Sequence, residues 1–344
     1  MTRREVLKQG FAWGVGATVG GALLSGCDCV PEIGWGPDVL RPVFYGHRDY
    51  TTADGAPGTL RVFYPSLDGA PDGAPIVECV GELPLVLFLH GQCSEADHHL
   101  KWFRLGATLA RCGFIVAMPS IANSVYPWVD PHPDYTLAVD VLGWMRGDWE
   151  MSARVMAEPN TAFAGHSRGA LLAGRLAIDQ PSSAYVSLGG VWTEWPGSPP
   201  NPLPTLPCPS MFAYGTADAQ SDVTGLWANI PQPKHLLRFD NGDHWDYISA
   251  ATTTCETSVG PCSLVEALAA DFTAVFISKH MPPEASSPFT IPDDLTVPAV
   301  ALTADQIFYA GAHLTSFSLI SSTAGCSVDV EWETAAGAGS RTLP

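Results

Sequence analysis

Basic residues are scarce in this sequence of 344 residues: 17 Lys and Arg stand against 35 Asp and Glu, which gives a net charge of −18. Proteins that bind nucleic-acid phosphates or anionic lipid headgroups need a basic surface. We therefore expect no nucleic-acid partner and no electrostatic attachment to an anionic membrane. Only 15% of the residues are charged and 46% are hydrophobic, a composition that excludes a disordered chain and indicates a globular one.

A long hydrophobic run is also missing, because the apolar stretch from Phe11 to Leu24 is too short for a transmembrane helix. Arg3 and Arg4 precede it and resemble the twin-arginine export consensus, and Leu24-Ser25-Gly26-Cys27 resembles a bacterial lipobox. We expect residues 1–26 to be a lipoprotein signal peptide and Cys27 to be lipidated. The protein would then be exported to the bacterial cell envelope and anchored to the membrane by its lipid. Plain secretion is the alternative.

No C-x-x-C motif occurs among the nine cysteines, so we expect no zinc cage and no other metal site. An exported chain can oxidise its cysteines, and eight remain once Cys27 is set aside. Their even number permits full pairing but gives no connectivity. The pair closest in sequence, Cys255 and Cys262, is the best candidate for a disulfide. The other six are Cys29, Cys79, Cys93, Cys112, Cys208 and Cys326.

No internal repeat is evident, and short apolar runs alternate with amphipathic stretches between residues 39 and 281. This alternation predicts an α/β domain with a mostly parallel central sheet and helices on both faces. Residues 27–38 are rich in Gly and Pro and are expected to form a tether. Residues 282–344 break the alternation, and we expect a small β-rich C-terminal appendage there, with strands at Ser316–Ile320 and Ser327–Trp332. A disordered tail is the alternative.

Strands are expected at Val39–Asp49, Thr59–Tyr64, Leu83–Leu89, Phe114–Met118, Thr161–Gly165, Tyr185–Leu188, Ser210–Tyr214 and Leu236–Phe239. Helices are expected at His99–Arg111, Tyr135–Met156, Arg168–Ile178 and Ser263–His280.

One short segment, Thr161 to Gly169, reads TAFAGHSRG and contains the pattern G-x-S-x-G. In this pattern a serine stands on a sharp turn between a strand and a helix, where it acts as a nucleophile. Such a turn needs neighbours without bulk, which Gly165 and Gly169 supply. Ser167 is therefore the candidate nucleophile. The alternative is a loop that enters a helix with Ser167 as its cap.

A serine nucleophile needs a base, and the base needs an acid that orients it. Asp218 follows the predicted strand Ser210–Tyr214 and is the candidate acid, with Asp222 as the second choice; a helix or turn cap is the alternative role for Asp218. His244 lies in a loop after the last predicted strand and is the candidate base, with a surface histidine as the alternative.

The oxyanion donors are expected to be the backbone N–H groups of Gln92 and Arg168. An ordinary turn at the end of a strand is the alternative for His90-Gly91-Gln92. Three tryptophans near the predicted triad, Trp192, Trp195 and Trp245, could form the wall of an acyl pocket or could belong to the core.

Glu95, Asp97, His98 and His99 cluster like metal ligands. Adjacent histidines on a helix point in different directions, so we expect a solvated helix start there instead.

Three segments carry a family resemblance: LFLHG at Leu87–Gly91, LARCGFIV at Leu109–Val116, and GHSRG at Gly165–Gly169. Together they resemble the chlorophyllase, platelet-activating-factor acetylhydrolase and cutinase-like polyester hydrolase branch of the α/β-hydrolase superfamily. The resemblance covers residues 39–281. It departs at Ala170, where many relatives have glycine, and at Gln92, where polyester hydrolases usually have an aromatic residue, which puts polyester specificity in doubt.

The resemblance implies an α/β-hydrolase fold and a serine hydrolase that cleaves small-molecule or lipid-like carboxylic esters through an acyl-enzyme, without a cofactor. Two alternatives remain open. One is a binding lipoprotein that keeps the fold and uses its C-terminal appendage to hold a partner. The other is a thioesterase or peptidase that uses the same triad.

Overall fold

The computed structural model describes twelve segments of the chain, and all of them belong to one compact unit, Leu40–Pro344. The described segments are residues 44–66, 72–76, 81–92, 97–122, 132–190, 206–218, 230–231, 233–239, 242–248, 265–281, 328–334 and 337–343.

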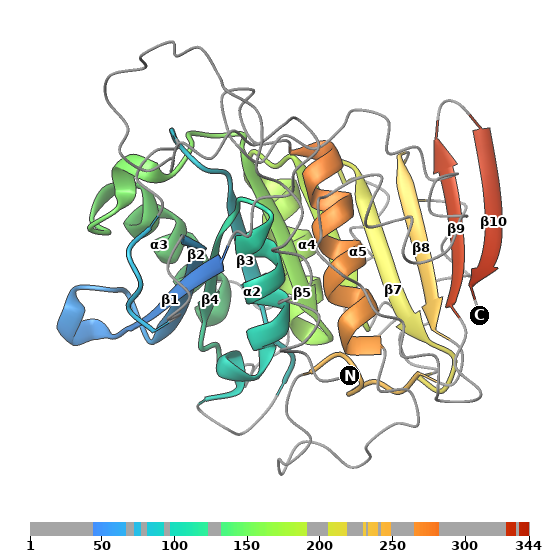
Figure 1. The fold of residues 1–344 in the computed structure, drawn as a ribbon, viewed down its shortest axis with the longest axis horizontal. Coiled ribbons are helices and arrows are strands. Elements are labelled where there is room, and N and C mark those ends of the chain that lie inside the picture. The colour runs from blue at the N-terminus through green and yellow to red at the C-terminus, as the bar shows by residue number, and fades with distance from the viewer. Residues whose placement is uncertain are drawn as a thin grey trace, which may run out of the picture. The chain divides into compact units, whose positions relative to one another are not determined.

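A single ten-stranded sheet organises this unit, with the strand order β1-β2-β4-β3-β5-β6-β7-β8-β9-β10 (Figure 1). The six strands from β3 to β8 run parallel, whereas β1, β2, β9 and β10 pair with their neighbours in antiparallel fashion. The strands are β1 (Phe44–Tyr50), β2 (Leu60–Ser66), β3 (Leu85–Leu89), β4 (Ile115–Pro119), β5 (Thr161–His166), β6 (Ala184–Leu188), β7 (Ser210–Gly215), β8 (Lys234–Phe239), β9 (Val328–Thr334) and β10 (Gly337–Leu343).

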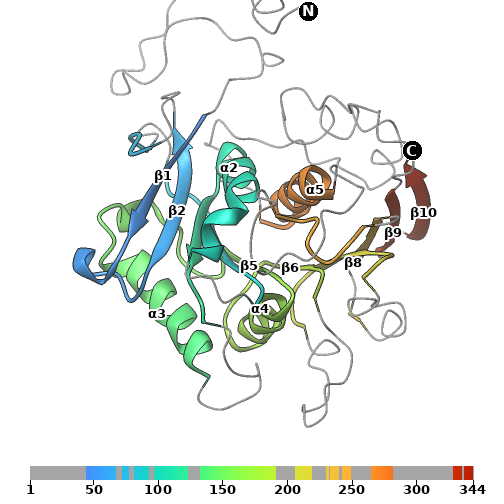
Figure 2. The ribbon, with the colours of Figure 1, turned by 90° about the horizontal axis from the view of Figure 1, so that it is seen from below.

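Helices cover both faces of the sheet. Helices α2 (Phe103–Arg111) and α5 (Val265–His280) lie on one face, and α3 (Pro133–Gly147) and α4 (Arg168–Asp179) lie on the other (Figure 2). The α/β class and the mostly parallel sheet predicted from the sequence are confirmed. Parallel strands between two helical layers are buried on both faces, which explains why β3 to β7 read as continuous apolar runs.

The two faces of the sheet bury separate cores, as β3 shows. Leu85, Leu87 and Leu89 pack with α3 and α4, whereas Val86 and Phe88 pack with α2 and α5. This alternation follows from the two-residue period of a strand.

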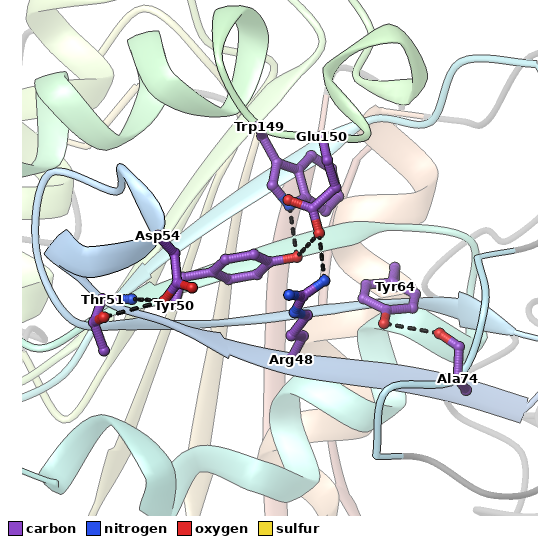
Figure 3. Close-up of polar contacts among 8 residues, drawn as sticks. All are labelled: Arg48, Tyr50, Thr51, Asp54, Tyr64, Ala74, Trp149 and Glu150. Carbon is purple, nitrogen blue, oxygen red and sulfur yellow. Dashed lines mark hydrogen bonds and ion pairs between the residues drawn. The ribbon is translucent and has the colours of Figure 1, made fainter.

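The helix expected over Tyr135–Met156 is shorter in the structure, because α3 ends at Gly147. The chain then turns so that Trp149 becomes buried and its indole N–H donates to the Tyr50 hydroxyl at 2.9 Å (Figure 3). The Tyr50 hydroxyl donates to Glu150 at 2.7 Å, and Arg48 forms an ion pair with the same carboxylate. Burial raises the pKa of Tyr50, which keeps it a hydrogen-bond donor. These contacts fix the end of α3 against β1.

The C-terminal strands extend the central sheet and do not form a sheet of their own. Strand β9 overlaps the expected strand Ser327–Trp332 and ends two residues later. It pairs with β8 so that Lys234 stands opposite Glu333 and Leu237 opposite Val330. Strand β10 was not predicted, and the strand expected at Ser316–Ile320 lies outside the described residues.

Two cysteines of the described segments, Cys112 and Cys208, are free and buried, so the full pairing that an even number allows does not form. Burial raises the pKa of the Cys112 thiol to about 12. Cys27, Cys255 and Cys262 lie outside the described residues, as do the expected signal peptide and tether. No helix within the described segments has the length and hydrophobicity needed to cross a bilayer.

Candidate active site

Ser167 lies between β5 and α4 in a backbone conformation that side chains rarely adopt, with φ 53° and ψ −123°. Among the described residues other than glycine, it alone has a positive φ. Its amide donates to the carbonyl of Leu188 at 3.0 Å, which continues the pairing of β5 with β6 up to the turn. A strained serine between a strand and a helix has the geometry of a nucleophile elbow.

The two glycines of the motif allow the strand and the helix to approach each other. A Cβ atom at Gly165 would lie 2.5 Å from the carbonyl carbon of Gly169. A Cβ atom at Gly169 would overlap the carbonyl oxygens of Leu89 and His90 at the end of β3. The first turn of α4 therefore packs directly on β3 and β5, and this packing requires glycine at both positions.

Asp218 and His244 come from the loops that follow β7 and β8. The His244 Nδ1–H group donates to Asp218 Oδ2 at 2.6 Å. The side chain of Asp218 is 4% exposed and that of His244 is 18% exposed. A buried carboxylate on Nδ1 leaves Nε2 of the imidazole as the atom that can take a proton, which is the arrangement a general base requires.

Backbone contacts hold these two loops together. A Cβ atom at Gly215 would overlap the carbonyl oxygen of Gly242, so the two loops touch at glycine. The Ala217 N–H group donates to the same carbonyl at 3.0 Å, and Thr216 N–H donates to the carbonyl of Phe239 at 2.9 Å. The Asp218–His244 hydrogen bond is therefore built on a rigid backbone junction at the carboxyl ends of β7 and β8.

His166 connects the loop that carries His244 (residues 242–248, the base loop) to the elbow at Ser167. Its Nε2–H group donates to the carbonyl oxygen of His244 at 2.8 Å, and the two imidazole centroids lie 4.7 Å apart. Ser167 is the next residue in the chain. The structure thus brings Ser167, His244 and Asp218 to the same edge of the sheet, as the sequence predicts.

The loop after β3 lies against the elbow on the other side. A Cβ atom at Gly91 would be 3.0 Å from Ser167 Cβ and 2.6 Å from His166 Nδ1. His90 fixes this loop, since its Nδ1–H group donates to the Gly91 carbonyl at 2.8 Å and its Nε2 accepts from Ile121 N–H at 3.0 Å. Burial lowers the pKa of His90 to about 3, so the imidazole stays neutral and keeps both bonds.

This bond of His90 also determines the direction of the Gln92 amide. In a trans peptide the C=O and N–H groups point to opposite sides, so fixing the Gly91 carbonyl fixes the Gln92 N–H group. The Gln92 side chain is exposed. The second expected donor, the amide of Arg168, belongs to the first residue of α4. A helix N-terminus of this kind favours negative charge.

Of the three tryptophans expected near the triad, Trp245 lies beside the base, with its ring perpendicular to His244 at a centroid distance of 5.0 Å. Its ring also lies 5.6 Å from that of His166 and 6.2 Å from that of His98. Trp192 and Trp195 lie outside the described residues, and so does Asp222, the second choice for the acid.

The expectation of a solvated helix start at His98 and His99 is wrong. Their segment is a short 3-10 helix, His98–Trp102, and the two residues are 0% and 3% exposed. His98 packs edge-on against His90 at a centroid distance of 5.0 Å, so it belongs to the interior beside the loop after β3. Within the described part of the chain, no three His, Cys, Asp or Glu residues are grouped so as to hold a metal ion.

No protein-family model and no curated protein matches this chain.

Three residues of the site were not predicted from the sequence: His166, Trp102 and Tyr247. Their rings meet at His166, which lies 5.0 Å from Trp102 and 5.6 Å from Tyr247. His166 stands inside the G-x-S-x-G pattern, so its place next to the candidate nucleophile could have indicated that it belongs to the site. Trp102 and Tyr247 had no signal that distinguishes them from core aromatic residues.

Proposed function

We propose that the protein is a serine hydrolase that cleaves carboxylic esters, with Ser167 as nucleophile, His244 as general base and Asp218 as the acid that orients it. The observation that carries the proposal is the 2.6 Å Asp218–His244 hydrogen bond, together with a serine of positive φ on a strand-to-helix turn. Several folds combine these three groups for acyl transfer, and their geometry identifies them.

In the proposed reaction, Ser167 Oγ attacks the ester carbonyl while His244 Nε2 takes the hydroxyl proton. His244 then gives this proton to the departing alcohol, and an acyl-enzyme remains. His244 then takes a proton from a water molecule, which attacks the acyl carbon, and gives this proton to Ser167 Oγ as the acid is released. Asp218 stabilises the imidazolium that forms in both halves. These groups complete the cycle themselves, so the proposal requires no metal or cofactor.

The oxyanion of each tetrahedral intermediate would be bound by the backbone N–H groups of Gln92 and Arg168. The His90 bond to Gly91 and the first turn of α4 hold these donors before substrate arrives. Donors that are already oriented need no reorganisation during the reaction, and one of them contributes about 100- to 1,000-fold in rate.

The finer features expected from the sequence belong to the same proposal. We place the protein in the chlorophyllase, platelet-activating-factor acetylhydrolase and cutinase-like branch of the α/β-hydrolases, with residues 39–281 as the catalytic domain. We also propose that the mature protein is exported and anchored to the cell envelope through Cys27. Trp245, which lies beside His244, is a candidate wall of the acyl pocket.

The test compares the wild-type chain with Ser167→Ala and with a control variant, Ser183→Ala. The Ser183 hydroxyl donates to the Pro159 carbonyl, away from the site. Hydrolysis of short p-nitrophenyl esters and labelling by a fluorophosphonate are measured on all three. We expect both signals in the wild type and in Ser183→Ala, and neither in Ser167→Ala. Labelling that survives Ser167→Ala, or a wild type that shows neither signal, would contradict the proposal. Matched thioester and amide substrates decide between an esterase and the other acyl-transfer activities.

A further inference from the structure

We propose that His166 is a positioning residue of this reaction, which holds the backbone of the base His244 at a fixed place relative to Ser167. The inference rests on the proposed function, because it concerns the same site. It assigns a role to the residue that precedes the nucleophile. Its basis is the 2.8 Å hydrogen bond from His166 Nε2–H to the His244 carbonyl oxygen.

The position of His166 in the structure allows it to act on three parts of the site. It is the last residue of β5, so its own backbone is held by the central sheet. Its ring bonds the base loop through His244 and lies against the loop after β3, where a Cβ atom at Gly91 would be 2.6 Å from Nδ1. The third segment is the turn after β6, where a Cβ atom at Gly189 would be 3.4 Å from Nε2. One rigid ring therefore sets the spacing of the loops around Ser167.

The hydrogen bond also fixes the chemical form of the ring. A carbonyl oxygen only accepts, so Nε2 of His166 must carry the proton. The residue is 0% exposed, and burial lowers its pKa well below the usual value, so the ring stays neutral. A neutral donor bonds the carbonyl without placing a positive charge beside His244, which itself becomes an imidazolium during the reaction. A lysine or arginine would supply a donor but would oppose that charge.

An aromatic ring without a donor would fill the same space and lose this function. Phenylalanine at position 166 keeps the packing against Trp102 and Tyr247 but leaves the His244 carbonyl without its partner. The base loop would then lose its link to the elbow, while the Asp218–His244 bond remains. Misplacement of a catalytic group by about 1 Å can lower a rate by roughly 100-fold.

The experiment compares the wild-type chain with His166→Phe, His166→Met and His166→Gln, using p-nitrophenyl acetate as substrate. Phenylalanine and methionine remove the donor, whereas glutamine retains an N–H group at the end of a side chain of similar reach. We expect kcat to fall roughly 10- to 100-fold in His166→Phe and His166→Met, with KM changed by less than about threefold. We expect His166→Gln to recover most of the lost kcat. The rate of fluorophosphonate labelling should follow kcat, and thermal unfolding shows which variants are folded.

Each outcome decides the inference. Wild-type kcat in a folded His166→Phe or His166→Met overturns it, because the donor is then unnecessary. An equal loss in the glutamine variant overturns it as well, since ring shape would be what matters. If both variants without a donor fail to fold while His166→Gln is folded and active, the bond serves the fold and the positioning role is also overturned. A wild type without esterase activity or labelling refutes the proposed function itself, a result that differs from all of these.

Discussion

At the scale of single residues, the feature that separates Ser167 from the other serines of the described segments is its backbone. A residue with a side chain at φ 53° costs of order 1–3 kcal/mol, which the packing around it must offset. That packing is visible in Gly165 and Gly169, which let β5, α4 and β3 meet at van der Waals contact. The turn therefore stores strain in order to present the hydroxyl group at the end of the strand.

This strain predicts a difference in stability between two variants of the proposed nucleophile. Glycine adopts a positive φ without a steric penalty, whereas alanine does not. We expect Ser167→Gly to be more stable than Ser167→Ala by about 1–3 kcal/mol, less about 0.4–1 kcal/mol for the greater freedom of glycine in the unfolded chain. Urea unfolding of both variants measures the difference through the midpoint at equal slope. Equal midpoints would show that the turn is relaxed.

At the scale of elements, the positions of the proposed acid and base depend on two loops that touch each other at glycine residues. Gly215 ends β7, and a side chain there would collide with the backbone of Gly242 in the loop after β8. The distance between Asp218 and His244 is thus set by a contact that involves neither of them.

We expect Gly215→Ala to lower kcat roughly 10- to 100-fold, because the loops must separate to admit the methyl group and the acid would then leave the base. The matched control is Gly143→Ala in the middle of α3, where an added Cβ meets nothing within 4 Å. It should leave kcat unchanged and stabilise the protein by roughly 0.5–1 kcal/mol, because alanine favours a helix. Steady-state kinetics with p-nitrophenyl acetate measure the effect, and an unchanged kcat in Gly215→Ala would refute it.

The elements of the sheet were predictable where their signals are local. Buried parallel strands such as β3 and β5 are short apolar runs, and α4 begins within the motif, directly after Ser167. The predicted bounds of these elements therefore lie within a few residues of the observed ones. The end of α3 was not predictable, since it depends on Trp149 reaching Tyr50, about a hundred residues earlier in the chain. Strand β10 was missed because Gly337–Leu343 lacks an apolar run.

The residues of the candidate site were likewise predictable where their signals are local. Chain order and loop position suffice to pick out Ser167, Asp218 and His244, because each follows a recognisable strand. The bond of His166 to the His244 carbonyl joins residues 78 positions apart, and no local pattern encodes it. The burial of His98 and His99 was missed for a similar reason, since a polar sequence says nothing of the aromatic residues that will cover it.

At the scale of the whole molecule, buried ionisable groups make stability depend on pH in two directions. Burial lowers the pKa of His90 and His235 to about 3 and that of His280 to about 4. Between these pKa values and about pH 6.5, the three histidines bind more protons in the unfolded chain than in the folded protein. Their contribution to the free energy of unfolding is therefore complete above about pH 6.5 and is lost as the pH falls. Asp271 on α5 acts in the opposite direction, because burial outweighs the nearby arginines Arg104 and Arg111 of α2 and raises its pKa to about 7.

For Asp271 the folded protein binds more protons than the unfolded chain between about pH 4 and pH 7, so its contribution falls as the pH rises. We expect Asp271→Asn to be close to the wild type in stability at pH 4 and more stable by an amount of order a few kcal/mol at pH 8. Urea unfolding at both pH values gives the comparison. A variant that is less stable than the wild type at pH 8 would contradict the expectation.

The residues of the candidate site lie at one end of the parallel strands. Every loop of the candidate site leaves the carboxyl end of a parallel strand, from Gly91 after β3 to His244 after β8, whereas the turn at 180–183 between α4 and β6 lies at the opposite edge. Pro181 is exposed in that turn. An affinity handle or a surface linker inserted there would immobilise the protein with its site turned outward, toward the dissolved substrate.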